Sequence, residues 1–318
     1  MSERRSGWPT LVYEDLASMV GYVNRVVQVA GKYTLDEPFE VGWGNVVLDV
    51  TPRGLRTPTF RQRGVTFTVH CRLLDGDVVI EADTGSRMVP LAKGSVATFY
   101  TAFRDAAAEL GIHRPRTSLI CEIPDCEPTF EDDRVERTWD HGAAQLMWEA
   151  LNLAADGLET WQAPFLGHRP RVGVMWGGFD LSATRHRGQP TEPPPPDRPT
   201  FMRNAQLKEY VAVGFSFGAA TAPSAGMYAY IWPQPDGLDG WSWGVDGAVW
   251  NADAGLVLLP WDKLGETTDP RQAIVTFGDA VYDAAVELAG WPSDLIGPRV
   301  DGWYMSRTRP ELVRAQHH

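Results

Sequence analysis

Apolar residues recur at helical spacing, three or four positions apart, in four segments of the chain. Each stripe predicts an amphipathic helix that buries one face. The predicted helices are residues 16–27, 96–110, 147–158 and 274–288. The second is followed by Gly111 and the fourth by Gly290, and glycine is the residue type that most often ends a helix.

Strict alternation of apolar and polar residues over 65–73 predicts a strand, and Asp75-Gly76 then turns the chain into a second strand at 78–80. This pattern indicates an antiparallel hairpin with one buried face. Four more strands are predicted further along, and Pro193–Pro196 indicates an exposed, extended loop between two of them. These strands are residues 171–182, 209–217, 227–232 and 255–260.

The chain resembles itself. An offset of 126 residues aligns 13–55 with 139–181, and an offset of 178 aligns 98–110 with 276–288. Because two segments recur in the same order, we predict an internal duplication, with a first repeat at 1–128 and an enlarged second repeat at 129–318.

The expected fold class is α+β. Two tandem, pseudo-symmetric repeats would each form an antiparallel sheet flanked by helices, and an approximate twofold axis would relate the two sheets within one compact unit. A cleft between the repeats is the expected place for a site.

Composition excludes several classes of function. The 318 residues carry a formal net charge of -12, which would repel nucleic acid and anionic lipid. No stretch of about 18 apolar residues exists, and the N-terminal residues lack a signal-peptide pattern, so a cytoplasmic protein without membrane contact is expected. Cys71, Cys121 and Cys126 are too few for a disulfide framework and match no zinc spacing, so no metal is predicted.

Known chemical motifs give little support to a specific reaction. Gly214-Phe215-Ser216-Phe217-Gly218 fits the pattern of a nucleophilic serine, but no helix pattern follows it as that fold requires. Dinucleotide, phosphate-loop, zinc-protease and calcium-loop motifs are not found in the sequence, so no cofactor is predicted.

The predicted strand 171–182 carries the most informative polar residue. Alternation puts Asp180 on the same face as Trp176, and Arg185 follows shortly after. A buried Asp180–Arg185 ion pair and a ligand-binding or acid/base role both fit this pattern.

Two further features have two interpretations each. Glu209 begins a predicted strand whose neighbour carries Tyr228 and Tyr230 on one face, which is typical of core but also of a small-molecule pocket. His70 lies on the polar face of the first hairpin, which is either solvated or part of the cleft between the repeats.

Several motifs together resemble the bacterial family of unknown function DUF5996, along nearly the whole chain. They are Trp8-Pro9, Thr51-Pro52-Arg53-Gly54-Leu55, the run from Trp176 to Arg185, Tyr228-Ala229-Tyr230 and Leu259-Pro260-Trp261. The resemblance implies no particular activity. The family pattern has an Asn-His-Trp-Trp run and a Ser-His-Glu run where this chain has residues 41–44 and 207–209, so Trp43 and Glu209 are kept and both histidines are missing.

Our leading hypothesis is a cofactor-independent enzyme that binds a small organic molecule. Asp180 and Glu209 would transfer protons, and Arg185 and His70 would orient or neutralise charge. The predicted ligand-binding residues are Trp43, Arg53, Trp176, Tyr228 and Tyr230. Isomerisation, cyclisation and hydrolysis all fit. The alternative is a non-catalytic module for ligand binding or protein interaction; neither the substrate nor the oligomeric state can be read from the sequence.

Overall fold

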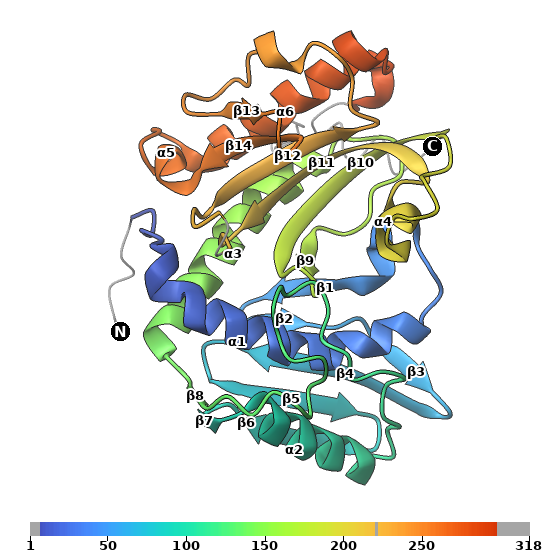
Figure 1. Ribbon diagram of the computed structural model, residues 1–318, viewed down its shortest axis with the longest axis vertical. Helices are drawn as coiled ribbons and strands as arrows, with labels where there is room; N and C mark the ends of the chain where they lie inside the picture. The colour runs from blue at the N-terminus through green and yellow to red at the C-terminus, as the bar shows by residue number, and fades with distance from the viewer. Residues whose placement is uncertain (1–6, 220–221, 298–318) are drawn as a thin grey trace, which may run out of the picture.

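The computed structural model describes residues 7–219 and 222–297 and has an α+β fold (Figure 1). Its N-terminal part begins with helix α1 and ends with helix α2, with a meander of strands between them. The elements are α1 (Tyr13–Gly31), β1 (Val47–Thr51), β2 (Gly54–Arg56), β3 (Phe60–Gln62), β4 (Val65–Arg72), β5 (Asp77–Ala82), β6 (Gly85–Pro90) and α2 (Val96–Glu109). Short 3-10 helices η1 (Lys32–Asp36) and η2 (Val41–Val46) follow α1.

The C-terminal part also has strands between two long helices. It begins with α3 (His141–Gln162) and ends with α6 (Pro270–Ala289). Between them lie β9 (Gly173–Met175), β10 (Asp180–Pro190), α4 (Thr200–Ala205), β11 (Lys208–Ser216), β12 (Gly226–Trp232), η3 (Leu238–Gly240), β13 (Val249–Asn251), β14 (Leu256–Pro260) and α5 (Trp261–Gly265); η4 (Ser293–Leu295) follows α6. The short strands β7 (Lys93–Gly94) and β8 (Arg137–Thr138) pair with each other near the connection of the two parts.

One antiparallel sheet of twelve strands runs through the described residues, in the order β13-β14-β12-β11-β10-β9-β1-β2-β4-β5-β6, with β3 beside β4. The two parts of the sheet join where β1 pairs with β9, at Val47 with Met175 and Leu48 with Val174. The prediction of a separate sheet in each repeat is therefore wrong, because the strands of both parts form one sheet. Backbone groups at the two inner edges satisfy one another instead of remaining unpaired.

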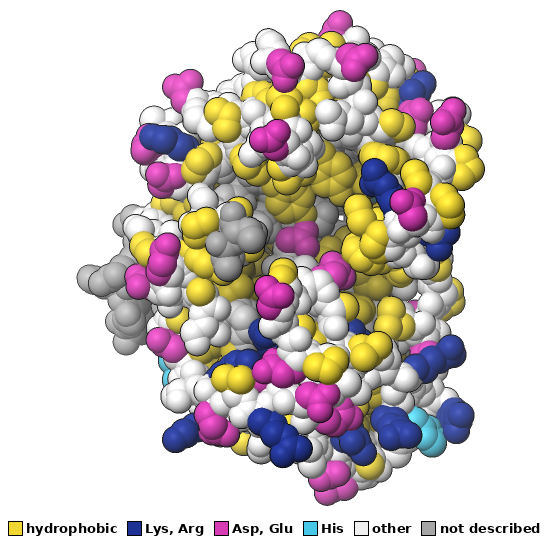
Figure 2. All heavy atoms as spheres, in the orientation of Figure 1, with side chains coloured by type: hydrophobic (Ala, Val, Ile, Leu, Met, Phe, Trp, Pro, Cys, Tyr) yellow, Lys and Arg dark blue, Asp and Glu magenta, His cyan; other side chains and the backbone are white. Residues whose placement is uncertain are grey.

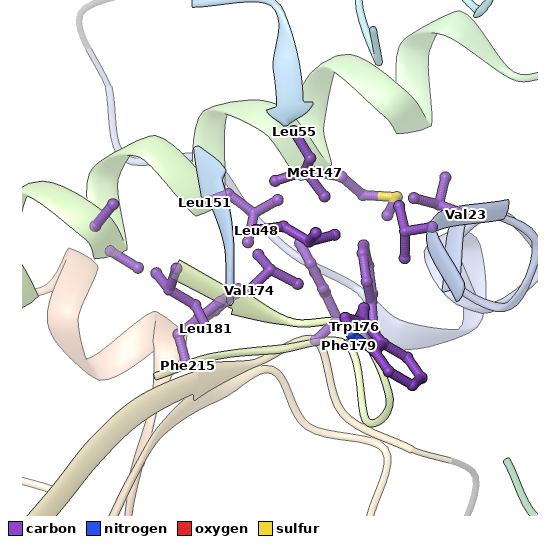
Figure 3. Close-up of a cluster of buried hydrophobic side chains, with 14 of the residues drawn as sticks. Val23, Leu48, Leu55, Met147, Leu151, Val174, Trp176, Phe179, Leu181 and Phe215 are labelled. Carbon is purple, nitrogen blue, oxygen red and sulfur yellow. The ribbon is translucent and has the colours of Figure 1, made fainter. Parts of the chain in front are cut away.

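The core lies between this sheet and the long helices. Residues that pair directly across neighbouring strands point to the same face of the sheet. Leu48 pairs with Val174, and Val174 pairs with Leu181, so all three point to one face. Figure 3 shows these side chains against Met147 and Leu151 of α3. α1 contributes Val23 to the same cluster, and α6 packs on α3 and on β11 and β12.

The four helices predicted from apolar stripes are confirmed, at α1, α2, α3 and α6. Local signals fix their ends. Ser95 caps α2 by accepting a hydrogen bond from the Thr98 amide at 3.1 Å, and Asp140 caps α3 in the same manner. Gly290 ends α6 in the left-handed conformation at φ 65°.

The expected single strand at 171–182 is instead two strands joined by a turn. β9 stops at Met175, residues 176–179 form the turn, and β10 begins at Asp180. The pair Gly177-Gly178 lies in this turn, and Phe179 closes it with a left-handed backbone at φ 58°. Trp176 and Asp180 therefore do not share the face of one strand.

Candidate active site

Strands β10, β11 and β12 turn one face away from α3, and this face carries an unusual mixture of small residues and tyrosines. Small side chains or none stand at Ala212 and Gly214 of β11, directly opposite Tyr230 and Tyr228 of β12. The Tyr228 ring covers Gly214, since a Cβ at this glycine would lie 2.3 Å from Cζ of the ring. Figure 2 shows a hollow on this side of the molecule, lined mainly by hydrophobic side chains with acidic groups at its floor.

Asp180 lies at the start of β10 on this face and is half-buried. The Tyr228 hydroxyl donates a short hydrogen bond to Oδ2 of Asp180. Burial raises the pKa of Asp180, while the hydrogen bond from Tyr228 lowers it. Asp180 is thus a carboxyl held near the surface of the hollow with one oxygen already positioned.

Glu122 is a second carboxyl at the same place, and it comes from the connection between α2 and α3. Its side chain lies against the glycines of the β9–β10 turn. An atom at the Cβ position of Gly178 would lie 3.1 Å from Oδ1 of Asp180 and 3.6 Å from Oε2 of Glu122. The two carboxyls therefore both lie close to the Cβ position that Gly178 leaves empty.

The electrostatics of Glu122 differ from those of an ordinary surface glutamate. Glu122 is exposed, but partial desolvation of its carboxyl raises its pKa, the negative charge of Asp180 raises the pKa further, and the Lys32 ammonium lowers it. Glu122 also has a left-handed backbone, at φ 59°. Such a conformation costs a non-glycine residue roughly 1–3 kcal/mol and persists only where the surrounding structure imposes it.

Buried polar groups behind the two carboxyls hold the loop of Glu122 against the β9–β10 turn. Gln28 of α1 donates through Nε2 to the Cys121 carbonyl at 2.8 Å and to the Gly177 carbonyl at 3.2 Å. In return, the Cys121 amide donates to Oε1 of Gln28 at 3.1 Å. One glutamine side chain thereby connects both segments that carry the site.

Lys32, at the end of α1, is buried next to this glutamine. Its Nζ lies 4.5 Å from the ring centre of Trp176 and 3.4 Å from Sγ of Cys121. Burial lowers the pKa of Lys32, and the neighbouring Cys121 and Glu122 act in the opposite direction. Trp176 itself is buried and donates through Nε1 to the Thr34 hydroxyl at 3.0 Å, so it forms the support of the site rather than its open wall.

A row of polar aromatic rings leads away from Asp180 along the sheet. The rings of Tyr228 and Tyr230 stack with centres 6.4 Å apart, and the Tyr210 hydroxyl donates to the Tyr230 hydroxyl at 3.3 Å. The far end of the row is His186, whose ring centre lies 5.2 Å from that of Tyr210. Burial lowers the pKa of His186 to about 4, so its ring is neutral at physiological pH.

Of the residues predicted from sequence, Asp180, Tyr228 and Tyr230 come together here, whereas Glu209 does not. Register pairs Tyr210 with His186, so Glu209 lies beyond that pair, at the opposite end of β10 from Asp180. Asp180 and His186 are six residues apart along β10, a distance of roughly 20 Å. Glu209 instead accepts a hydrogen bond from Nη1 of Arg187 at 2.8 Å.

Arg185 and Trp43 also lie elsewhere. Arg185 is in the middle of β10 with the opposite parity to Asp180, and it is fully buried on the helix side, with its guanidinium 4.0 Å from the ring centre of Trp161. The predicted pairing of Arg185 with Asp180 is therefore wrong. Trp43 is half-buried and donates through Nε1 to the Phe201 carbonyl at 2.8 Å.

His70 and Arg53 line a different feature, an open groove of about 890 Å³ in the N-terminal part of the sheet. Nε2 of His70 lies 3.3 Å from Oε2 of Glu81, and Nε of Arg53 donates to Asp75 at 2.6 Å. Ser182 lies on β10 two residues after Asp180. His70 is in the same row of the sheet as Ser182 but four strands away, a distance of roughly 19 Å. The residues predicted as one site thus belong to at least two places.

Sequence reasoning missed Glu122. The segment Cys121-Glu122-Ile123-Pro124 has no periodicity that would place it on a helix or strand, and only the long-range contacts of Gln28 bring it to Asp180. Among the described residues, no group of three or more His, Cys, Asp or Glu side chains is arranged to hold a metal ion. Within the same residues, no helix is long and apolar enough to cross a membrane.

The fold and the site define an α+β protein with one extended antiparallel sheet and a pair of neighbouring carboxyls at the end of a row of tyrosines. The chain belongs to the family of unknown function DUF5996, whose model matches residues 8–297. Comparison with curated proteins gives no match, and neither does comparison with solved structures.

Proposed function

We propose that the protein is a cofactor-independent enzyme that transfers protons on a small organic molecule, with Asp180 and Glu122 as its catalytic residues. The observation that carries the proposal is that two carboxyls lie beside the exposed Gly178, with Oδ1 of Asp180 3.1 Å and Oε2 of Glu122 3.6 Å from the Cβ position that this glycine leaves empty. Two neighbouring carboxyls can give a proton to a substrate and take one from it in the same step.

The surroundings support different roles for the two groups. Tyr228 donates a hydrogen bond to Asp180, which stabilises the ionised form, so Asp180 acts as the base. A negative Asp180 raises the pKa of Glu122 in addition to the effect of partial desolvation, so Glu122 holds its proton more tightly and acts as the acid. Glu122 gives its proton, Asp180 accepts one, and exchange with water restores both groups.

The hollow supports a substrate with an apolar body and polar substituents. The stacked rings of Tyr228 and Tyr230 offer flat surfaces, and their hydroxyls offer hydrogen bonds. Isomerisation, cyclisation and hydrolysis are all compatible with paired proton transfer. The left-handed backbones of Glu122 and Phe179 add support, because strained residues cluster at functional sites.

Turnover of a pool of small molecules tests this proposal. Purified protein is incubated with a metabolite extract, and compounds consumed and formed are followed by untargeted mass spectrometry. We expect wild type to consume at least one compound, with Asp180→Asn and Glu122→Gln losing that activity and Glu266→Gln, an exposed surface change, retaining it.

Two other outcomes would count against acid/base catalysis. If both carboxyl variants consumed the compound as fast as wild type, the assignment of Asp180 and Glu122 would be abandoned. If wild type retained a compound without changing it, and both variants retained it equally, a non-catalytic binding module would be the better description.

We also propose that the two parts of the chain descend from one duplicated unit. Each part runs from helix through antiparallel strands to helix, and outward from the β1–β9 pair the strands follow chain order as far as β12 on one side and, apart from β3, as far as β6 on the other. Leu48 and Val174, which the sequence offset of 126 makes equivalent, pair directly with each other. An experimental structure in which residues 13–110 and 139–288 failed to superpose would contradict the duplication. The cytoplasmic location and the lack of a nucleic-acid partner stay predictions.

A further inference from the structure

The groove that His70 and Arg53 line lies at a different place in the sheet from Asp180, next to the junction of β1 and β9. β1 pairs with β9 only through Val47 and Leu48, and residues 169–172 then run past the rest of β1 without pairing to it. α3 closes the space between them with Glu159 and Gln162. The result is an open groove of about 890 Å³, a size typical of small-molecule sites.

Five arginines line this space, and we call it the arginine groove. They are Arg53, Arg56, Arg72, Arg169 and Arg171, with His70 beside them. Only two lining residues, Asp49 and Glu159, are acidic. This excess of positive charge contrasts with the net charge of -12 of the whole chain.

The carboxylates next to the groove orient the arginines without occupying all of their donors. Asp49 alone holds two guanidiniums, since Arg56 donates to its Oδ2 at 2.7 Å and Arg171 donates to its Oδ1. Nε of Arg72 donates to Asp77 at 2.6 Å. Each arginine carries five N–H groups, so this arrangement leaves unused donors facing the groove.

Three of these guanidiniums are the most available. Within the described part of the chain, Arg169 makes no hydrogen bond or ion pair, and Nε and Nη1 of Arg56 and Nε of Arg171 have no acceptor. Arg56 and Arg171 are each about half-exposed, so a ligand can reach them. Positively charged donors in a fixed arrangement match the oxygen atoms of phosphate and carboxylate groups.

We propose that the arginine groove binds a small polyanion, a molecule that carries two or more adjacent phosphate or carboxylate groups. One shared carboxylate, Asp49, holds the guanidiniums of Arg56 and Arg171 together at the groove. This site is distinct from the carboxyl pair of Asp180 and Glu122, and it does not depend on the function proposed for that pair.

Isothermal titration calorimetry with pyrophosphate and with citrate tests the proposal on the full-length protein. We expect one of these anions to bind wild type with a 1:1 stoichiometry at low ionic strength, and added salt to weaken binding. Tighter binding of pyrophosphate indicates a phosphate-bearing ligand, and tighter binding of citrate indicates a polycarboxylate. No measurable binding of either anion would overturn the proposal.

Variants decide whether the groove is the binding site. The double change Arg56→Gln and Arg171→Gln should weaken binding at least about tenfold. Arg87→Gln should leave it unchanged, because Arg87 has a similar exposure but pairs with Glu109 outside the groove. Equal weakening by both changes, or none by the double change, would contradict the proposal.

A variant that is expected to bind the anion more tightly separates an effect on binding from a loss of folding. Asp49→Asn removes the carboxylate that competes for two guanidiniums, and exposed ion pairs add little to stability, so the variant should fold. We expect it to bind the anion several-fold more tightly than wild type. Weaker binding by a folded Asp49→Asn would mean that the arginines serve only to join β1 to residues 169–172.

Discussion

The Cβ position that Gly178 leaves empty beside the two carboxyls can be filled by a single methyl group, in the variant Gly178→Ala. The added Cβ would lie 3.1 Å from Oδ1 of Asp180 and 3.6 Å from Oε2 of Glu122, with no other atom beyond the adjacent residues within 4 Å. The first distance is slightly short, so the Asp180 carboxyl must shift by a few tenths of an ångström. The methyl group would displace a substrate atom that packs on Gly178 beside the two carboxyls.

The expected effects on stability and activity are very different. Gly178 does not have a left-handed backbone, so alanine brings no strain there, and a permitted change from glycine to alanine gains about 0.4–1 kcal/mol through the unfolded chain. The close contact offsets part of this gain. We therefore expect the free energy of unfolding to stay within about 1 kcal/mol of wild type, while turnover falls at least about 100-fold.

Urea unfolding followed by circular dichroism, together with the turnover assay, measures both quantities. Gly240→Ala is the matched control, because a Cβ there contacts nothing and both properties should remain at wild-type values. Gly177→Ala serves as a second comparison, since its Cβ would lie 2.0 Å from Oε1 of Glu122 and must displace that flexible side chain. A stable Gly178→Ala protein with full activity would refute the assignment of this position to the substrate.

Three other changes test the electrostatics and the core. Tyr228→Phe removes the hydrogen bond that favours ionised Asp180, so the pKa of Asp180 should rise further in a ¹³C NMR titration, and an unchanged value would contradict the role of the phenol. The pKa of Glu122 is raised in the folded state, so the contribution of this carboxyl to folding is fully present below its unfolded pKa and is lost as pH rises through its folded pKa. Glu122→Gln should therefore unfold at a higher urea concentration than wild type near pH 8, but not near pH 4. Leu181→Ala empties a fully buried site and should cost about 2–5 kcal/mol in urea unfolding, whereas Leu153→Ala, at 37% exposure, should cost less than about 1 kcal/mol.

Local patterns in the sequence predicted most of the elements. The four long helices follow from apolar spacing, and strands β11, β12 and β14 lie within one residue of the ranges predicted for them. The turn after Asp75 also leads from β4 into β5 as expected. These features depend on residues close together in the chain, which is why periodicity finds them.

The errors arise where local pattern and long-range pairing diverge. Apolar residues continue on both sides of Gly177-Gly178, so the turn was predicted as one strand, although paired glycines are a turn signal. That single turn moves Asp180 relative to Trp176. Arg185 is on the opposite face from Asp180 because β10 continues past the predicted end at 182 as far as Pro190. Neither the pairing of β1 with β9 nor the approach of Glu122 to Asp180 has a local signal, because residues far apart in sequence make both contacts.

The most direct test of the central claim is the titration of Glu122 by ¹³C NMR in wild type and in Asp180→Asn. Our account predicts a pKa for Glu122 above the ordinary glutamate value in wild type, and a lower pKa once the negative charge at position 180 is removed. A Glu122 that titrates at the ordinary value, or whose pKa is the same in both proteins, would show that the two carboxyls do not form one site.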